Sequence, residues 1–208
     1  MKLCGLEDRA EQNQIAVDAL RAAGVVCNSI FDLVSGATPN AAVPVLIGLL
    51  QTLDEVVICE GLVRALRVDA AKGLAETHLI ALFRRLPTND QTTSLKWAIG
   101  NTLEGLDRQR HVEDLIDLAL DRSHGMPRQM IVSALARLKN QRVTPALIEL
   151  LDDEDVNGHA IGALRLRKVR EAVPRLVLFE RHDNAWKRKT ARAAIEAILK
   201  STQPSSIH

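Results

Sequence analysis

A short apolar pattern recurs along this chain at nearly constant spacing, and this spacing limits the possible folds more than any other feature. The sequence contains five copies of one kernel: VPVLIGLL (43–50), ETHLIALF (76–83), EDLIDLAL (113–120), TPALIELL (144–151) and VPRLVLFE (173–180). Their equivalent leucines follow one another after 33, 36, 32 and 29 residues. A second apolar run follows each copy, and its closing residue keeps nearly the same period. Because the leucines of the first runs and the closing residues of the second runs keep nearly the same period, the sequence indicates a stacked array of repeats.

Both runs of each repeat have the periodicity of an α-helix. In TPALIELL the apolar residues fill one helix face, and Pro145 stands in the first turn, where a proline is tolerated. Acidic breaks such as DDED (152–155) precede the second runs, where they favour helix N-caps. Aromatic residues make up only 2% of the chain, and there is no Tyr, so the core must consist of aliphatic side chains. The sequence therefore predicts an all-α fold, an α-solenoid of antiparallel helix pairs.

Alanines recur inside the second runs, at positions expected to face a neighbouring helix. Small side chains allow helices to approach closely, and bulkier residues one turn away fill the remaining space. These positions are Ala65, Ala98, Ala134, Ala160, Ala163, Ala191 and Ala194.

The pattern P-x-L-(I/V)-x-L-L-x-D-x-(D/E), followed by x-x-A-x-x-A-L, resembles the HEAT-like repeats of bacterial proteins, including those of the phycobilisome-lyase type. The resemblance covers about residues 41–199 and is strongest at 143–199. It implies an HEAT/armadillo-like superhelix and an Arg at the start of each second helix. That position falls at Cys59, Lys96, Arg128, Asn157 and Arg188. Because only two of the five are Arg, we expect the Asp–Arg ladder of the family to be partial.

The predicted domain is a single solenoid over residues 1–200. Residues 1–40 are expected to form a degenerate capping unit, residues 41–199 five helical repeats, and residues 201–208 a disordered polar tail. The three cysteines are widely spaced, no apolar leader is visible, and no apolar run is long enough to span a bilayer. We therefore expect a cytoplasmic protein that does not engage membranes.

The second helices of such stacks usually line the concave side, so their solvent-facing residues are the candidate partner-binding residues. Trp97 is the most distinctive of them, because Trp and Arg dominate interface hot spots, although packing of its indole along the neighbouring helix is the more ordinary interpretation. The predicted partner-binding face comprises Arg64, Arg67, Trp97, Asn101, Gln129, Arg165 and Lys189.

The last repeats are basic, with eleven Lys and Arg against four Asp and Glu over residues 165–200. Lys187, Arg188 and Arg192 could contact phosphate or an acidic protein surface, although a solvated helix face is the alternative interpretation. Trp186 is interpreted as a packing staple at the start of the last helix.

No local motif for catalysis, metal binding or phosphate binding is visible, so we expect no enzymatic activity, no cofactor and no metal. The leading hypothesis is a non-catalytic scaffold that binds a protein partner on the concave face. The alternative is a nucleic-acid backbone binder that uses the basic C-terminal repeats, as some relatives of the resembled family do. The mildly acidic N-terminal half and the wide separation of the two Trp weigh against it. A pigment-lyase-like role is a third and weaker hypothesis.

Overall fold

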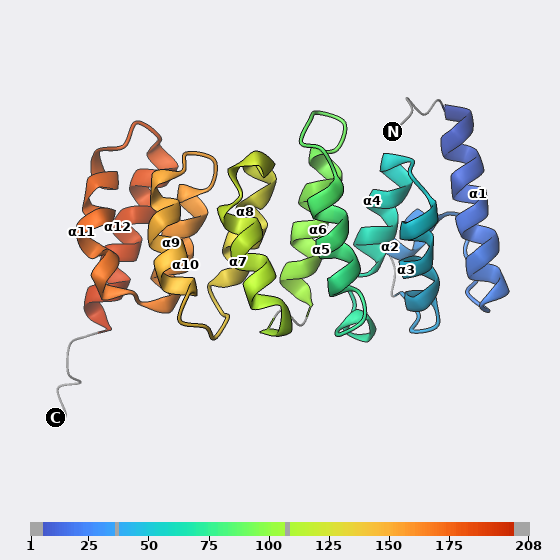
Figure 1. Ribbon diagram of the computed structural model, residues 1–208, viewed down its shortest axis with the longest axis horizontal. Coiled ribbons are helices and arrows are strands. Elements are labelled where there is room, and N and C mark those ends of the chain that lie inside the picture. The colour runs from blue at the N-terminus through green and yellow to red at the C-terminus, as the bar shows by residue number, and fades with distance from the viewer. Residues whose placement is uncertain (1–5, 36–37, 107–108, 202–208) are drawn as a thin grey trace. The chain divides into compact units, whose positions relative to one another are not determined.

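The computed structural model describes residues 6–35, 38–106 and 109–201, and across these residues the fold is all-α, without a strand (Figure 1). The chain divides into two compact units, Met1–His111 and Val112–His208. In both units the helices pack on their neighbours in the sequence, as in an α-solenoid of HEAT type. The predicted single-domain boundary stays a prediction. The predicted tail lies outside the described residues apart from Ser201, as does Cys4.

The first unit contains six α-helices among its described residues. They are α1 (Leu6–Ala22), α2 (Ile30–Ser35), α3 (Ala42–Thr52), α4 (Val56–Ala65), α5 (Glu76–Arg85) and α6 (Thr93–Gly105), with 3-10 turns η1 (Asp69–Ala71) and η2 (Gln109–His111). The even-numbered helices pack on one another, α2 on α4 and α4 on α6, while α1 and α3 pack on the other side. This arrangement gives one layer of second helices.

The second unit repeats the same layering with α8, α10 and α12 as its second helices. Its α-helices are α7 (Val112–Leu120), α8 (Gln129–Leu135), α9 (Val143–Glu149), α10 (Asn157–Arg167), α11 (Val173–Leu178) and α12 (Ala185–Lys200). Its 3-10 turns are η3 (Arg122–His124), η4 (Met126–Arg128), η5 (Leu150–Asp152), η6 (Arg170–Ala172) and η7 (Phe179–Arg181). A helix therefore occurs over every predicted apolar run.

Small side chains bring the second helices together, as the sequence predicts. All seven recurring alanines of these helices are buried. In unit 1, Gly61 on α4 makes room for α2, because a Cβ atom there would lie only 3.1 Å from the ring of Phe31. Thr102 on α6 also donates a hydrogen bond to the Val63 carbonyl on α4, at 3.0 Å. Close packing of this kind makes each helix pair depend on the next.

Polar residues of the turns cap the second helices, although not in a uniform way. The Glu55 carboxylate accepts from the Ile58 amide at 2.8 Å, and Asn184 accepts from the amides of Trp186 and Lys187. The DDED turn differs from the expectation, because α10 has no side-chain cap. Its Asp153 binds the Asp155 amide within the turn and an arginine of the preceding helix pair.

That arginine is Arg128, which is fully buried at the start of α8. It donates to the carbonyls of Ala119 (2.8 Å) and Gly125 (2.9 Å) and to the Asp153 carboxylate (2.9 Å). One side chain thus joins the end of α7, the turn before α8 and the turn before α10. It is a rung of the Asp–Arg ladder that the resemblance implies.

The residues at the equivalent position of the other second helices show how the Asp–Arg ladder is reduced. Arg188 donates to the carbonyls of His182 and Asp183 in its own turn, both at 2.7 Å, and Lys96 donates to Thr88 at 2.8 Å. Cys59 reaches the Leu53 carbonyl at 3.4 Å. The residue at this position therefore contacts the preceding turn even where it is not an arginine.

Asn157 is too short for this role. Its side chain is buried, its amide group donates to Glu154 at 3.3 Å, and its Oδ1 atom has no hydrogen-bond partner. A buried acceptor without a partner lowers stability.

These two positions should respond differently to apolar replacement. Arg128→Met removes the cation that pairs with the buried Asp153 carboxylate and the donor to two carbonyls, and we expect it to lower the free energy of unfolding by about 3–5 kcal/mol. Asn157→Leu removes an unsatisfied acceptor, and we expect a change of less than about 1 kcal/mol. Urea unfolding of both variants measures the difference. Equal losses would contradict the assignment of Arg128 as the residue that joins two helix pairs.

Candidate polar and aromatic surface on the second helices

In unit 1 the predicted partner-binding residues lie on the second helices, except Arg67, which follows the end of α4, and the arginine charges are paired within the unit. Arg64 is exposed and contacts Glu60 on its own helix at 2.7 Å, while Ser94 on α6 donates to the same carboxylate at 2.6 Å. Arg67 lies 4.0 Å from Glu104. The Arg67 side chain also covers Gly105, where a Cβ atom would lie 3.2 Å from it. This face therefore presents little net charge.

Trp97 and Asn101 are four residues apart on α6 and share one face of that helix. Both are half-buried, so part of the Trp97 indole packs against the protein and part remains accessible. This intermediate burial satisfies both interpretations of Trp97, and its role in binding stays a prediction.

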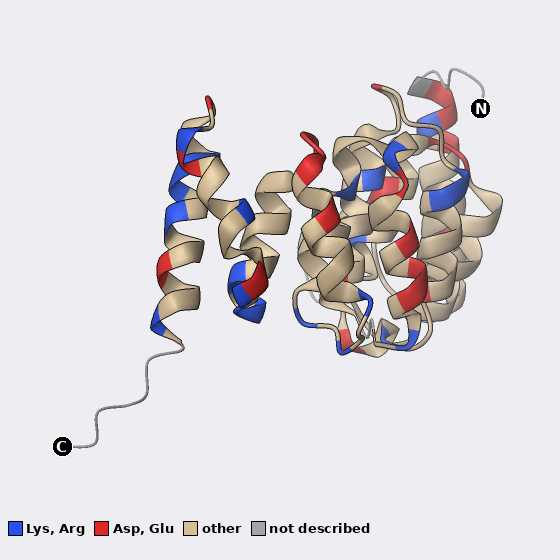
Figure 2. Cartoon of the chain, turned by 60° about the vertical axis from the view of Figure 1, so that its left-hand side comes forward, with Lys and Arg blue, Asp and Glu red and all other residues tan. Residues whose placement is uncertain are grey.

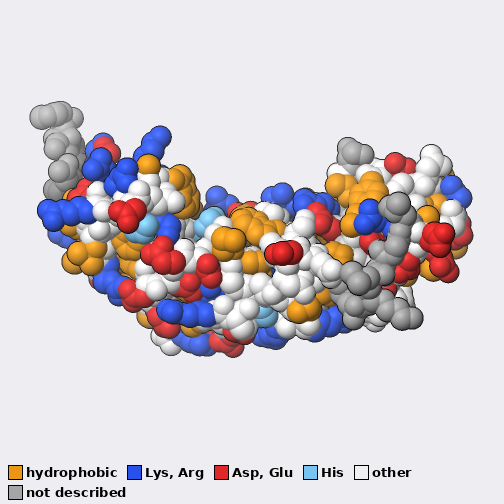
Figure 3. All heavy atoms as spheres, turned by 90° about the horizontal axis from the view of Figure 1, so that it is seen from above, with side chains coloured by type: hydrophobic (Ala, Val, Ile, Leu, Met, Phe, Trp, Pro, Cys, Tyr) orange, Lys and Arg blue, Asp and Glu red, His pale blue; other side chains and the backbone are white. Residues whose placement is uncertain are grey.

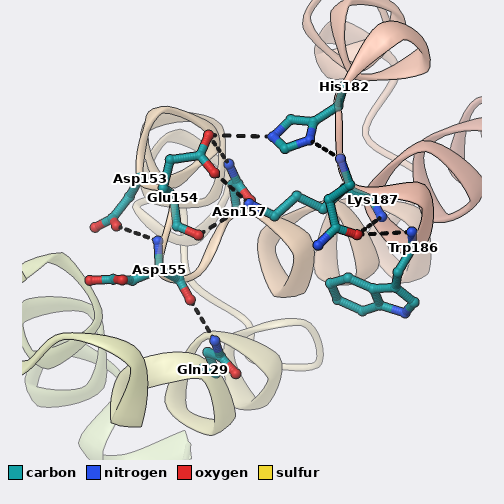
Figure 4. Close-up of polar contacts among 9 residues, drawn as sticks. Gln129, Asp153, Glu154, Asp155, Asn157, His182, Trp186 and Lys187 are labelled. Carbon is teal, nitrogen blue, oxygen red and sulfur yellow. Dashed lines mark hydrogen bonds and ion pairs between the residues drawn. The ribbon is translucent and has the colours of Figure 1, made fainter.

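In unit 2 a polar network links the N-terminal ends of α8, α10 and α12 (Figure 4). Gln129 at the start of α8 donates to the Asp155 carbonyl at 2.6 Å. Glu154 accepts from Lys187 at 2.6 Å and lies 3.4 Å from the Nε2 atom of His182. The hydrogen bond from Lys187 is the main reason that the pKa of Glu154 is lowered. The three helix starts are thus held in register by hydrogen bonds and ion pairs.

The basic residues predicted to meet phosphate are largely engaged in such internal contacts. Lys187 is buried and bound to Glu154, Arg188 is half-buried on the turn carbonyls, and the exposed Arg192 lies 3.9 Å from Glu180. Figure 2 shows the basic positions along α12 interrupted by an acidic one. In the space-filling view, basic, acidic and hydrophobic side chains are interspersed over the visible face (Figure 3). A surface of one charge sign is not visible on it.

Trp186 lies across the start of α10, on the same side as the exposed residues of the second helices. Its ring covers Gly158, where a Cβ atom would lie 2.1 Å from the Cζ3 atom, and its centroid is 5.7 Å from that of His159. The indole nevertheless remains 51% exposed. Trp186 therefore acts as the expected staple and also presents an aromatic surface to solvent, which the sequence interpretation did not include.

Around Trp186 the surface is open and basic. Gly162, one turn after Gly158, has open space where a side chain would stand. Arg165 and Lys189 are exposed, and neither has an ion-pair or hydrogen-bond partner among the described residues. We call Trp186, Gly158, Gly162, Arg165 and Lys189 the Trp186 surface.

Residues 79–158 match the HEAT repeats family, from α5 to the start of α10. These residues form HEAT-like repeats. No curated protein matches this chain. Within the described residues, no group of three or more His, Cys, Asp or Glu side chains is arranged to hold a metal ion. In the same residues, no helix has both the length and the apolar character that crossing a membrane requires.

The position of the Trp186 ring can be tested with a pair of glycine substitutions. Gly158→Ala places a methyl group inside the indole, so the ring must move, and we expect a loss of about 1–3 kcal/mol in the free energy of unfolding. A shift of the tryptophan emission maximum should accompany it. Gly162→Ala is the matched control on the same helix. It meets open space, and we expect a gain of up to about 1 kcal/mol from helix propensity. Similar effects of both substitutions would contradict the contact.

His159 beside Trp186 makes the stability of unit 2 sensitive to acid. Burial lowers the pKa of His159 below its usual value of 6.5. As the pH falls below 6.5, the unfolded chain takes up a proton before the folded chain does, so the free energy of unfolding decreases. We expect His159→Gln to lose less stability than the wild type between about pH 7 and about pH 5 in urea unfolding. Equal losses would exclude His159 as the source.

Proposed function

We propose that this chain is a non-catalytic protein-interaction module and that the Trp186 surface is its main docking site. HEAT repeats commonly serve as protein-interaction scaffolds, and the match over residues 79–158 supports this class of function. The observation that carries the proposal is the half-exposed indole of Trp186, held in place by Gly158 and by the caps and ion pairs at the start of α12.

A fixed and partly exposed Trp is favourable for binding for two reasons. Its large ring contributes contact area, which is why Trp is frequent among interface hot spots. Its conformation is also restricted before the partner arrives, so little conformational entropy is lost on binding. The unit 1 face around Trp97, with Arg64, Arg67 and Asn101, is proposed as a second and less basic contact area.

Nucleic-acid binding remains the alternative, because residues 157–200 carry eleven Lys and Arg against four Asp and Glu. The internal pairing of Lys187, Arg188 and Arg192 favours the protein-binding proposal, since a backbone binder needs its cations free for phosphate.

Selection of random peptides displayed on phage against the purified chain tests the proposal. We expect peptides to be enriched on the wild type and to lose at least about tenfold in recovery on Trp186→Ala. Leu178→Ala, which removes a 72% exposed side chain from α11, is the matched control and should leave recovery unchanged. Recovery that does not depend on Trp186 would contradict the docking site. Tight, steeply salt-dependent binding of random-sequence DNA or RNA, measured by anisotropy, would favour the alternative.

A further inference from the structure

Two of the exposed cations of unit 2, Arg165 and Lys189, lie on the same surface as the exposed indole, and this arrangement restricts the chemistry of the partner. Of the eleven basic residues in 157–200, six are bound internally, namely Arg167, Arg175, Lys187, Arg188, Arg192 and Lys200. Arg165 and Lys189 are exposed on the Trp186 surface and have no partner among the described residues. The nearest acidic residue of α12 on this face, Glu196, is paired with Lys200 at 2.5 Å. The surface is therefore left with unpaired positive charge.

The repeat pattern indicates how Lys189, Gly158 and Arg165 are placed relative to one another. Lys189 and Gly158 occupy equivalent positions of α12 and α10, while Arg165 is seven residues further along α10 than Gly158, or about 10 Å along the helix axis. Gly162 lies between Gly158 and Arg165 on the same face, with open space above its backbone. An extended segment of about four residues spans the distance from Lys189 to Arg165.

We infer that the Trp186 surface binds an extended acidic segment of a partner protein, with an apolar side chain on the Trp186 ring and carboxylates on Lys189 and Arg165. This inference rests on the proposed protein-binding function and specifies its ligand. An extended chain fits because Gly162 allows its backbone to approach α10 closely. Carboxylates fit because the two cations are exposed and have no internal anion, unlike Arg64 and Arg67 in unit 1.

A protein segment explains the Trp186 surface better than a nucleic acid does. Two cations and one aromatic ring form a short path, whereas backbone binding of nucleic acid requires a longer row of free cations. The neighbouring basic residues that would extend the row, Lys187 and Arg188, are bound to Glu154 and to the turn carbonyls.

The test uses fluorescein-labelled peptides of twelve residues and the full chain. One peptide repeats Glu-Leu-Asp, and its control replaces Glu by Gln and Asp by Asn. We expect the acidic peptide to bind at least about tenfold more tightly than the neutral one, and to weaken as salt is raised. Trp186→Ala and the double variant Arg165→Ala/Lys189→Ala should each weaken the acidic peptide by about tenfold. Lys72→Ala, which removes one exposed cation from unit 1, should change its affinity by less than about twofold.

The other outcomes separate this inference from the proposed function. Equal affinity for the neutral peptide, with Trp186 still required, would overturn the inference and leave protein binding intact. Acidic-peptide binding that survives the double variant would overturn the placement on this surface. If a single-stranded oligonucleotide of matched charge binds as tightly as the acidic peptide, the ligand of this surface is a nucleic acid and the inference of a protein segment is wrong. Failure of both the synthetic peptides and the phage selection would overturn both proposals.

Discussion

A pair of short helices cannot bury its apolar faces by itself, and this constraint governs the structure of both units. Within each unit the second helices therefore pack on one another, across alanines and glycines that bring the backbones close together. Close approach leaves little space for polar groups at the helix starts. Between α7, α8 and α10 the buried Arg128 supplies hydrogen bonds to the polar groups, because it donates to two carbonyls and to the Asp153 carboxylate. Where the arginine is replaced by Asn157, the structure keeps a buried oxygen without a partner.

Position 157 carries Asn where the equivalent position 128 carries Arg, and a different set of contacts links α10 and α12. Lys187 reaches back to Glu154 in the preceding turn, and Asn184 caps the helix on which Trp186 stands. These contacts fix the start of α12 against α10, and the absence of a side chain at Gly158 provides the space for the indole. A local change in the repeat pattern thus yields an ordered aromatic surface, and stability and proposed function depend on the same few residues.

The two units differ in how they use charge on their second helices. In unit 1 the carboxylates of Glu60 and Glu104 lie beside Arg64 and Arg67, so the positive charges are compensated within the unit. In unit 2 Asp153, Glu154 and Glu196 are engaged with Arg128, Lys187 and Lys200, whereas Arg165 and Lys189 have no partner among the described residues. Similar helix layers can therefore present different surfaces, because exposed positions on a repeat scaffold vary without disturbing its core.

The sequence alone determined the helix pairs, their period, the buried alanines and the partial ladder, because these features follow from apolar spacing and from side-chain size within one repeat. It also placed Trp97, Arg64 and Arg165 on the second helices. Only the tertiary structure decided which cations are free, because some of the pairs join different repeats, such as Glu154 and Lys187, which are 33 positions apart. The same holds for Trp186. Its sequence context indicates a packing residue, but its half-exposed ring results from the missing side chain at Gly158, a contact between successive pairs that periodicity within one repeat does not encode.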